Sequence, residues 1–182
     1  YTFQTDMFVV KYDNNLQYQW AFDIGIPNLS ESPSSLNIDH GGNLVISGNF
    51  YGPNTSIDFD PSPNIALVTA SGNRTGFVAK YTSAGNLLWV KDFDTPNPSM
   101  QISATDLVIG NNDDITVTGS FITEMDLDPG PASSIITTTG NNSSFFLLQL
   151  NPAGDYNWGF GFNSSGGVNV SGMTIDSINN IY

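Results

Sequence analysis

Two short acidic motifs carry the residues of this sequence whose types and spacing could do chemistry. Asp58-x-Asp60-Pro61 and Asp126-x-Asp128-Pro129 share the pattern D-x-D-P. In an extended backbone, residues i and i+2 point to the same side, so each pair of carboxylates could converge on Ca2+, which takes about six to eight oxygen ligands. The alternative is a loop in which aspartate accepts hydrogen bonds from the following amides and proline fixes the turn. The pattern D-x-D-x-D-G of a full calcium loop is absent, which favours the loop alternative.

Other catalytic chemistry has little support in the sequence. Cysteine is absent, which excludes thiol nucleophiles, disulfides and zinc-thiolate sites. His40 is the only histidine and stands in the turn IDHGGN, where we expect it to be exposed. Lys11 and Lys80 are expected to neutralise a neighbouring aspartate. We therefore expect no enzymatic activity and no cofactor other than Ca2+ at the two acidic motifs.

The charge of the chain excludes whole classes of partner. There are 17 Asp and Glu residues against 4 Lys and Arg in 182 residues, a formal net charge of −13. Binding to nucleic acid or to an anionic membrane needs clustered cations, and here the four are scattered. Apolar runs stay well below the length that a membrane helix needs, so we expect no membrane span.

An internal repeat organises the chain. Trp20, Trp89 and Trp158 are 69 residues apart, as are Lys11, Lys80 and Gln149. The length then corresponds to about 2.6 repeats (182/69) in one continuous region over 1–182. We place repeat 1 at 7–75, repeat 2 at 76–144 and a partial repeat 3 at 145–182.

Each repeat is predicted to form four short strands. Segments such as FVAKYTSAGNLLW and SLNIDHGGNLVISGNF alternate around Asn- and Gly-rich turns, which is typical of hairpins. The D-x-D-P stretch and the Thr-rich segment after it form either a long connection or an extra strand. Helical periodicity is missing, so we expect an all-β chain. The recurring aromatic residues are expected to pack between repeats rather than to bind sugar: Trp20, Trp89, Trp158, Phe50 and Phe121.

The repeat resembles the bacterial SBBP repeat. The residues that carry the resemblance in the second copy are Phe77, Lys80, Tyr81, Gly85, Asn86 and Trp89, followed by Gly119, Phe121, Asp126, Asp128, Pro129 and Gly130. The first copy has Asn15 where we expect the turn glycine. The resemblance implies consecutive four-stranded antiparallel β-propeller blades of a secreted or cell-surface protein, and we expect the chain to be part of a larger propeller.

These observations favour a non-catalytic repeat scaffold with a structural or adhesive role, extracellular or at the cell surface. Its expected partners are a protein or glycan at the cell surface, and further blades of the same protein or other copies. The alternative is a propeller-based polysaccharide hydrolase or lyase with a carboxylate site. Only the D-x-D-P pairs offer such a site, and their repetition favours the scaffold.

Overall fold

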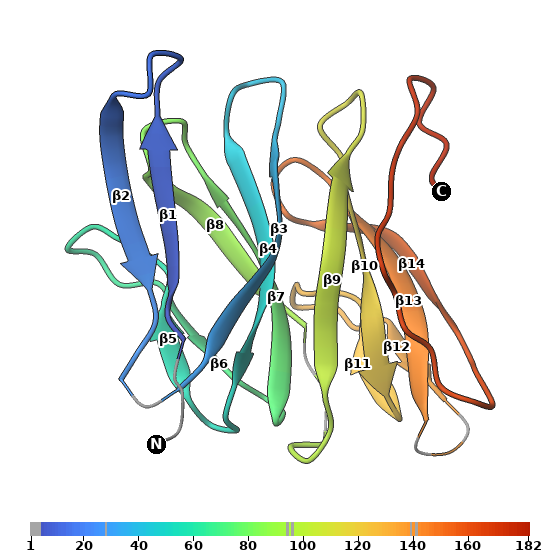
Figure 1. The fold of residues 1–182 in the computed structure, drawn as a ribbon. Coiled ribbons are helices and arrows are strands. Elements are labelled where there is room, and N and C mark those ends of the chain that lie inside the picture. Colours follow the sequence, from blue (N-terminus) through green and yellow to red (C-terminus); the bar gives the residue numbers. More distant parts are fainter. Residues whose placement is uncertain (1–4, 28, 94, 96, 139, 141) are drawn as a thin grey trace.

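The chain is built from strands and turns, as the sequence predicts. The computed structural model describes residues 5–27, 29–93, 95, 97–138, 140 and 142–182 (Figure 1). Within these ranges there is no helix, and so none that could cross a membrane. The strands are β1 (Met7–Tyr12), β2 (Tyr18–Ile24), β3 (Glu31–Ile38), β4 (Leu44–Tyr51), β5 (Ser56–Asp58), β6 (Leu67–Thr69), β7 (Arg74–Tyr81), β8 (Leu87–Asp92), β9 (Ile102–Ile109), β10 (Ile115–Ile122), β11 (Glu124–Asp126), β12 (Ile135–Thr137), β13 (Ser143–Leu150) and β14 (Tyr156–Phe162).

Two four-stranded antiparallel sheets make up most of the fold. One has the order β3-β4-β7-β8 and the other the order β9-β10-β13-β14. β9 contacts β3, β4 and β7, so the second sheet lies against the first (Figure 1). This all-β arrangement of successive antiparallel sheets is consistent with a β-propeller-like repeat fold.

The D-x-D-P segments form small hairpins outside the two large sheets. β5 pairs with β6 and β11 pairs with β12, each in a separate two-stranded sheet. The first aspartate of each motif, Asp58 or Asp126, is the last residue of its strand. The segment that the sequence left open as a connection or an extra strand therefore supplies two short strands per repeat.

The sequence repeat and the four-stranded sheet are offset from each other. β3 and β4 lie in the first sequence repeat, whereas β7 and β8 of the same sheet lie in the second. β1 and β2 pair with each other as β7 and β8 do. At the other end, a single bridge joins Ile175 to Ile181. Each large sheet therefore combines the end of one sequence repeat with the beginning of the next.

The core lies on both faces of the first large sheet. Phe50 and Phe121, which the repeat predicts as core residues, are 0% and 1% exposed. Phe50 belongs to a cluster that fills the space between β1–β2 and the first sheet. Phe121 belongs to a second cluster, which includes Val45 and Val78 from the opposite face of the first sheet. Burial of apolar side chains between successive sheets therefore holds the repeats together.

The tight turns after β1, β7 and β13 share one backbone requirement. Their equivalent residues Leu16, Gly85 and Gly154 have φ of 60°, 85° and 84°, the left-handed region that favours glycine. The expectation that Asn15 takes the place of the turn glycine is wrong, because the left-handed position falls on Leu16. The ungapped repeat alignment already pairs Leu16 with Gly85, which are 69 residues apart.

Candidate functional site

The recurring lysine and tryptophan bind the turn of the next repeat. Lys80 Nζ and Trp89 Nε1 both donate to the carbonyl oxygen of Pro152, each at 3.2 Å. Lys80 and Trp89 are directly opposite each other on β7 and β8, so their side chains lie on one face of the sheet. Pro152 is in the turn between β13 and β14. The pair therefore clamps the second large sheet to the first.

The same clamp occurs one repeat earlier. Lys11 Nζ and Trp20 Nε1 donate to the carbonyl oxygen of Ser83, at 2.7 and 3.3 Å. Ser83 precedes Pro152 by 69 residues, and it lies in the turn between β7 and β8. The Lys11 ammonium also lies 5.9 Å from the centre of the Trp20 ring. Both tryptophans are partly buried and pack against the core clusters, which agrees with their expected packing between repeats.

The turn glycines make this contact possible. A Cβ atom on Gly154 would lie 3.0 Å from Trp89, and one on Gly85 would lie 3.4 Å from Trp20. The backbone angle thus favours glycine at the second and third copies of this turn, and at Gly154 the close approach of the indole ring adds a second reason. Leu16, in the first copy, is 80% exposed.

The third copy of the clamp residues is arranged differently. Trp158 Nε1 donates to Oε1 of its own neighbour Gln149 at 3.0 Å. The Trp158 ring stacks on Phe160, with 5.8 Å between ring centres. Phe160 and Phe162 are 40% and 56% exposed. The third tryptophan is therefore partly buried on an open face instead of clamping a turn.

Lys80 also forms a buried ion pair. Its Nζ lies 2.8 Å from Oδ2 of Asp39, in the turn between β3 and β4. Burial raises the pKa of Asp39, but the hydrogen bonds from Lys80 and Asn43 outweigh it and hold that pKa below its usual value. The expectation that a recurring lysine neutralises an aspartate is confirmed for Lys80. In the next repeat Gly110 takes the place of Asp39, and Gln149 takes the place of Lys80, so acid and base are absent together.

The turns at one end of the large sheets are linked by a second repeated contact. The backbone amide of His40 and its Nδ1 both lie within hydrogen-bond distance of Oδ1 of Asp113, at 2.9 and 2.7 Å. In the next repeat, the backbone amide of Asn111 donates to Oδ1 of Asn179 at 2.9 Å. Figure 1 shows these turns at the same end of the molecule. The His40 side chain is 65% exposed, as its turn predicts, and it acts as a link between repeats.

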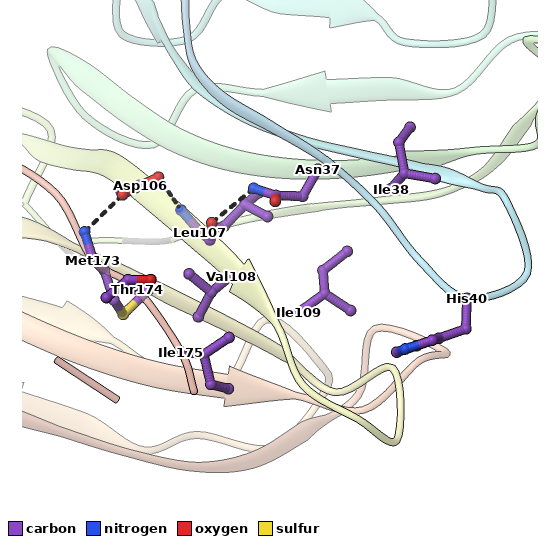
Figure 2. A pocket seen from close by; sticks show the side chains of 10 residues that line it. All are labelled: Asn37, Ile38, His40, Asp106, Leu107, Val108, Ile109, Met173, Thr174 and Ile175. Carbon is purple, nitrogen blue, oxygen red and sulfur yellow. Dashed lines mark hydrogen bonds between the residues drawn. The ribbon is translucent and has the colours of Figure 1, made fainter. Parts of the chain in front are cut away.

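A groove of about 380 Å³ lies along the first strands of the two large sheets (Figure 2). Its polar groups are engaged: Asn37 Nδ2 donates to the Leu107 carbonyl at 2.9 Å, and Asp106 accepts from the amides of Leu107 and Met173 at 2.8 and 2.7 Å. Aliphatic residues also line the groove, but polar atoms supply more of its exposed wall than apolar atoms do. This arrangement suits binding better than acid–base chemistry. The groove is lined by Asn37, Ile38, His40, Asp106, Leu107, Val108, Ile109, Met173, Thr174 and Ile175.

The aspartates of the first D-x-D-P motif bind backbone amides of their own loop. Asp58 Oδ1 accepts from the amides of Asp60 and Ala66 at 3.0 and 2.8 Å, and Asp60 Oδ1 accepts from Ser62 at 2.9 Å. The Ser62 amide and side chain hold the pKa of Asp60 below its usual value. These contacts match the loop alternative.

The second D-x-D-P motif repeats this pattern. Asp126 Oδ1 accepts from the amides of Asp128 and Ser134, at 3.0 and 2.7 Å, and Asp128 Oδ1 accepts from Gly130 at 2.7 Å. Across the described residues, no group of three or more His, Cys, Asp or Glu side chains is placed to hold a metal ion. Calcium binding by these motifs stays a prediction.

Comparison with known proteins gives one distant relative. No protein-family model matches the chain. The chain is 26% identical over 188 aligned residues to an uncharacterized WD repeat-containing protein, L264, of Acanthamoeba polyphaga mimivirus. The match covers 90% of this chain but only 13% of that protein. A similarity to a repeat protein agrees with the all-β fold, and the chain spans a small part of the relative's length.

Sequence reasoning missed the partners of the recurring residues. Every residue has a backbone carbonyl oxygen, so the sequence does not show that those of Ser83 and Pro152 are the acceptors. Only the tertiary structure identifies them. Asp39 could have been predicted as the partner of Lys80, because both residues are replaced together one repeat later, by Gly110 and Gln149. The groove could not be predicted because it combines segments about 70 and 140 residues apart.

Proposed function

We propose that this chain is a non-catalytic repeat scaffold made of β-propeller-type blades, which presents the groove along β3 and β9 to a protein partner. Each four-stranded sheet is one blade, and β3 and β9 are the strands nearest the propeller axis. The chain binds through a surface assembled from several repeats and performs no reaction itself.

The observation that carries this proposal is the recurrence of the polar contacts between repeats. The lysine and tryptophan clamp is made at Ser83 and again at Pro152. The D-x-D-P carboxylates, which offered the enzymatic alternative, each accept amides of their own loop in both copies. A catalytic site normally occurs once, whereas repeated contacts serve the assembly of a scaffold. The recurring lysines and tryptophans and the D-x-D-P aspartates thus stabilise the fold.

The similarity to a WD repeat-containing protein supports a repeat scaffold for protein interaction. Ile38, which is 55% exposed, adds apolar surface at the edge of the groove. The carbonyl and carboxylate oxygens in the groove can each accept a further hydrogen bond, so the backbone amides of a peptide segment could bind them while its side chains meet the aliphatic residues. We therefore propose a protein as the partner, with a glycan as the second possibility at the same surface.

The decisive experiment compares two substitutions of exposed aliphatic residues. Ile38→Asp places a charge on β3 at the edge of the groove, whereas Leu88→Asp places one on β8, at the opposite edge of the same sheet, where Leu88 is 50% exposed. Wild-type and variant chains are used for affinity purification from the source cells, with quantitative mass spectrometry and circular dichroism of each chain. We expect proteins that Leu88→Asp retains and Ile38→Asp loses by roughly tenfold or more.

Two results would contradict the proposal. Equal recovery by both folded variants would remove the groove as the binding surface. Release of reducing sugars from polysaccharides by the wild-type chain, abolished by Asp58→Asn or Asp126→Asn, would instead favour the hydrolase or lyase.

We further propose that the scaffold acts outside the cell or at its surface. The resemblance to the SBBP repeat of secreted and cell-surface proteins supports this location. Proteolysis of intact source cells, followed by immunodetection of the chain, tests it. Protection of the chain until the cells are lysed would contradict the proposal.

A further inference from the structure

The outer face of β13–β14 repeats a surface that is covered in the preceding sheet. Phe145, Leu147 and Gln149 lie opposite Phe162, Phe160 and Trp158 on this face. One repeat earlier, the equivalent of Leu147 is Val78, which is fully buried in the core between the two large sheets. On β13–β14 a hollow of about 200 Å³ remains between Leu147 and the C-terminal residues Ile181 and Tyr182.

The turn at Asp176 reproduces the turn at Asp39. Asp39 accepts from the backbone amide and the side-chain amide of Asn43, at 2.8 and 2.9 Å. Asp176 accepts from the same two groups of Asn180, at 2.9 and 2.8 Å. The two turns differ in the next donor. Lys80 Nζ lies 2.8 Å from Asp39 Oδ2, whereas the hydroxyl of Tyr182 lies 3.3 Å from Asp176 Oδ2.

We propose that Asp176 and the outer face of β13–β14 form a receptor for one more hairpin of this repeat, equivalent to β7–β8, which completes a third four-stranded blade and supplies a lysine to Asp176 and a turn carbonyl to Trp158. The inference rests on the blade-type scaffold proposed above and adds the residues that recognise the incoming hairpin. Phe160 and Phe162 provide the apolar surface, and Gln149 takes the place of the clamp lysine.

A second copy of this chain fits the receptor poorly. Its available hairpin is β1–β2, with Leu16 at the position of Gly85 and Gly154. Gly154 approaches Trp89 so closely that a Cβ atom would lie 3.0 Å from the indole ring. The Leu16 side chain would therefore collide with Trp158 in the same geometry. The incoming hairpin must carry glycine at this turn, as TSAGN and NPAGD do.

The chain itself provides a suitable hairpin for the test. Tyr182 aligns with Val45, because Asp176 and Asp39 head equivalent turns. Appending a copy of Ile46–Asp92 after Tyr182 completes a four-stranded blade with its own D-x-D-P hairpin, TSAGN turn and lysine. In the extended chain the copy of Lys80 follows Asp176 by 41 residues, the separation of Asp39 and Lys80.

The readouts are the melting temperature and hydrogen exchange of the Trp158 indole N–H by NMR. We expect the extended chain to melt in one transition at a higher temperature and the Trp158 indole to exchange roughly tenfold more slowly, because its N–H becomes a buried donor. Asp176→Asn should lower the melting temperature more in the extended chain than in the 182-residue chain. Changing the appended copy of Lys80 to Met is the matched control, and it should remove most of that difference.

Several results would overturn the inference. The appended segment could remain unfolded, or Trp158 exchange could stay unchanged. Asp176→Asn could have the same effect with and without the appended lysine. A stable dimer of the 182-residue chain that protects Trp158 would identify a second copy as the occupant instead. Each of these concerns assembly of blades, so it is distinguishable from failure of partner binding at the groove.

Discussion

Lys80 and Asp39 form an ion pair that is almost completely enclosed, with Nζ 2.8 Å from Oδ2 and the side chains 6% and 2% exposed. Lys80 lies on β7 and Asp39 in the turn before β4, so the pair fixes the turn within its own sheet. Because Lys80 also donates to Pro152, the same ammonium joins that sheet to the next one.

Removing the ammonium should leave a buried carboxylate without its partner. We expect Lys80→Met to lower the free energy of unfolding by about 3–5 kcal/mol. Lys11→Met is the control, because Lys11 makes its contact to Ser83 in an exposed setting, and it should cost about 1 kcal/mol or less. Urea denaturation of both variants measures this. Similar losses of stability in the two variants would show that the ion pair with Asp39 contributes no stability.

The lowered pKa of Asp39 also gives a pH dependence. Burial raises this pKa, but Lys80 and Asn43 lower it more, so the folded chain holds the ionised form better than the unfolded chain does. This contribution to stability is present at neutral pH and is lost as the pH falls through the folded pKa. Lys80→Met should therefore weaken the fall in the free energy of unfolding at acid pH. An unchanged fall in this variant would contradict the interpretation.

The turn glycine that meets Trp89 should tolerate no side chain. Gly154→Ala adds both a left-handed backbone cost and a contact at 3.0 Å, so we expect a loss of about 2–4 kcal/mol. Gly167 has φ of 82° and open space around its Cβ position, so Gly167→Ala should cost only about 1 kcal/mol. Thermal denaturation compares them. Equal losses of stability in the two variants would mean that the Trp89 indole moves away from the added methyl group without an energetic cost.

The D-x-D-P loops should be stabilised by their amides regardless of calcium. Asp126 accepts from Asp128, Ser134 and the hydroxyl of Ser133, so Asp126→Ala should cost about 1–3 kcal/mol. Calorimetry in Ca2+ and in chelator, with the exposed Asp23→Ala as control, checks this. A melting temperature of the wild-type chain that rises with Ca2+ and no longer does so in Asp126→Ala would favour the calcium site instead. Equal melting temperatures would end the calcium prediction.

Glu31 should make the chain less stable as the pH rises. Its side chain is 1% exposed, and burial followed by the nearby carboxylate of Asp6 raises its pKa to about 7. The unfolded chain ionises Glu31 near pH 4.5, so the folded state loses stability between about pH 4.5 and 7. Glu31→Gln should remove this decline and be more stable than wild type above pH 7. Melting curves across that range test it, and parallel curves for the two chains would contradict the prediction.

Much of the fold follows from local pattern. The alternating segments around DNN, SAGN and NPAGD predict the hairpins that β1–β2, β7–β8 and β13–β14 form. Strand alternation and turn residues act within a few positions, so a single chain reveals them. The grouping of strands into sheets was less accessible, because β4 and β7 are neighbours in the sheet but are separated by the D-x-D-P hairpin.

The candidate site was predictable only in its residue types. The recurrence of Lys80 and Trp89 indicated a structural role, and an aspartate partner was expected for the lysine. That Asp39 is this partner depends on the β3–β4 turn reaching the end of β7. The groove residues His40, Asp106 and Ile175 come from three successive turns or strands, and their meeting depends on how the sheets stack.

By itself, the sequence determined an acidic, cysteine-free, all-β chain with a 69-residue repeat, because composition and period are properties of the linear chain. The tertiary structure decided which atoms the repeated residues contact. Lysine and tryptophan side chains reach across to carbonyl oxygens of Ser83 and Pro152, and such acceptors are present in every residue of a chain. Only the packing of one sheet against the next selects two of them.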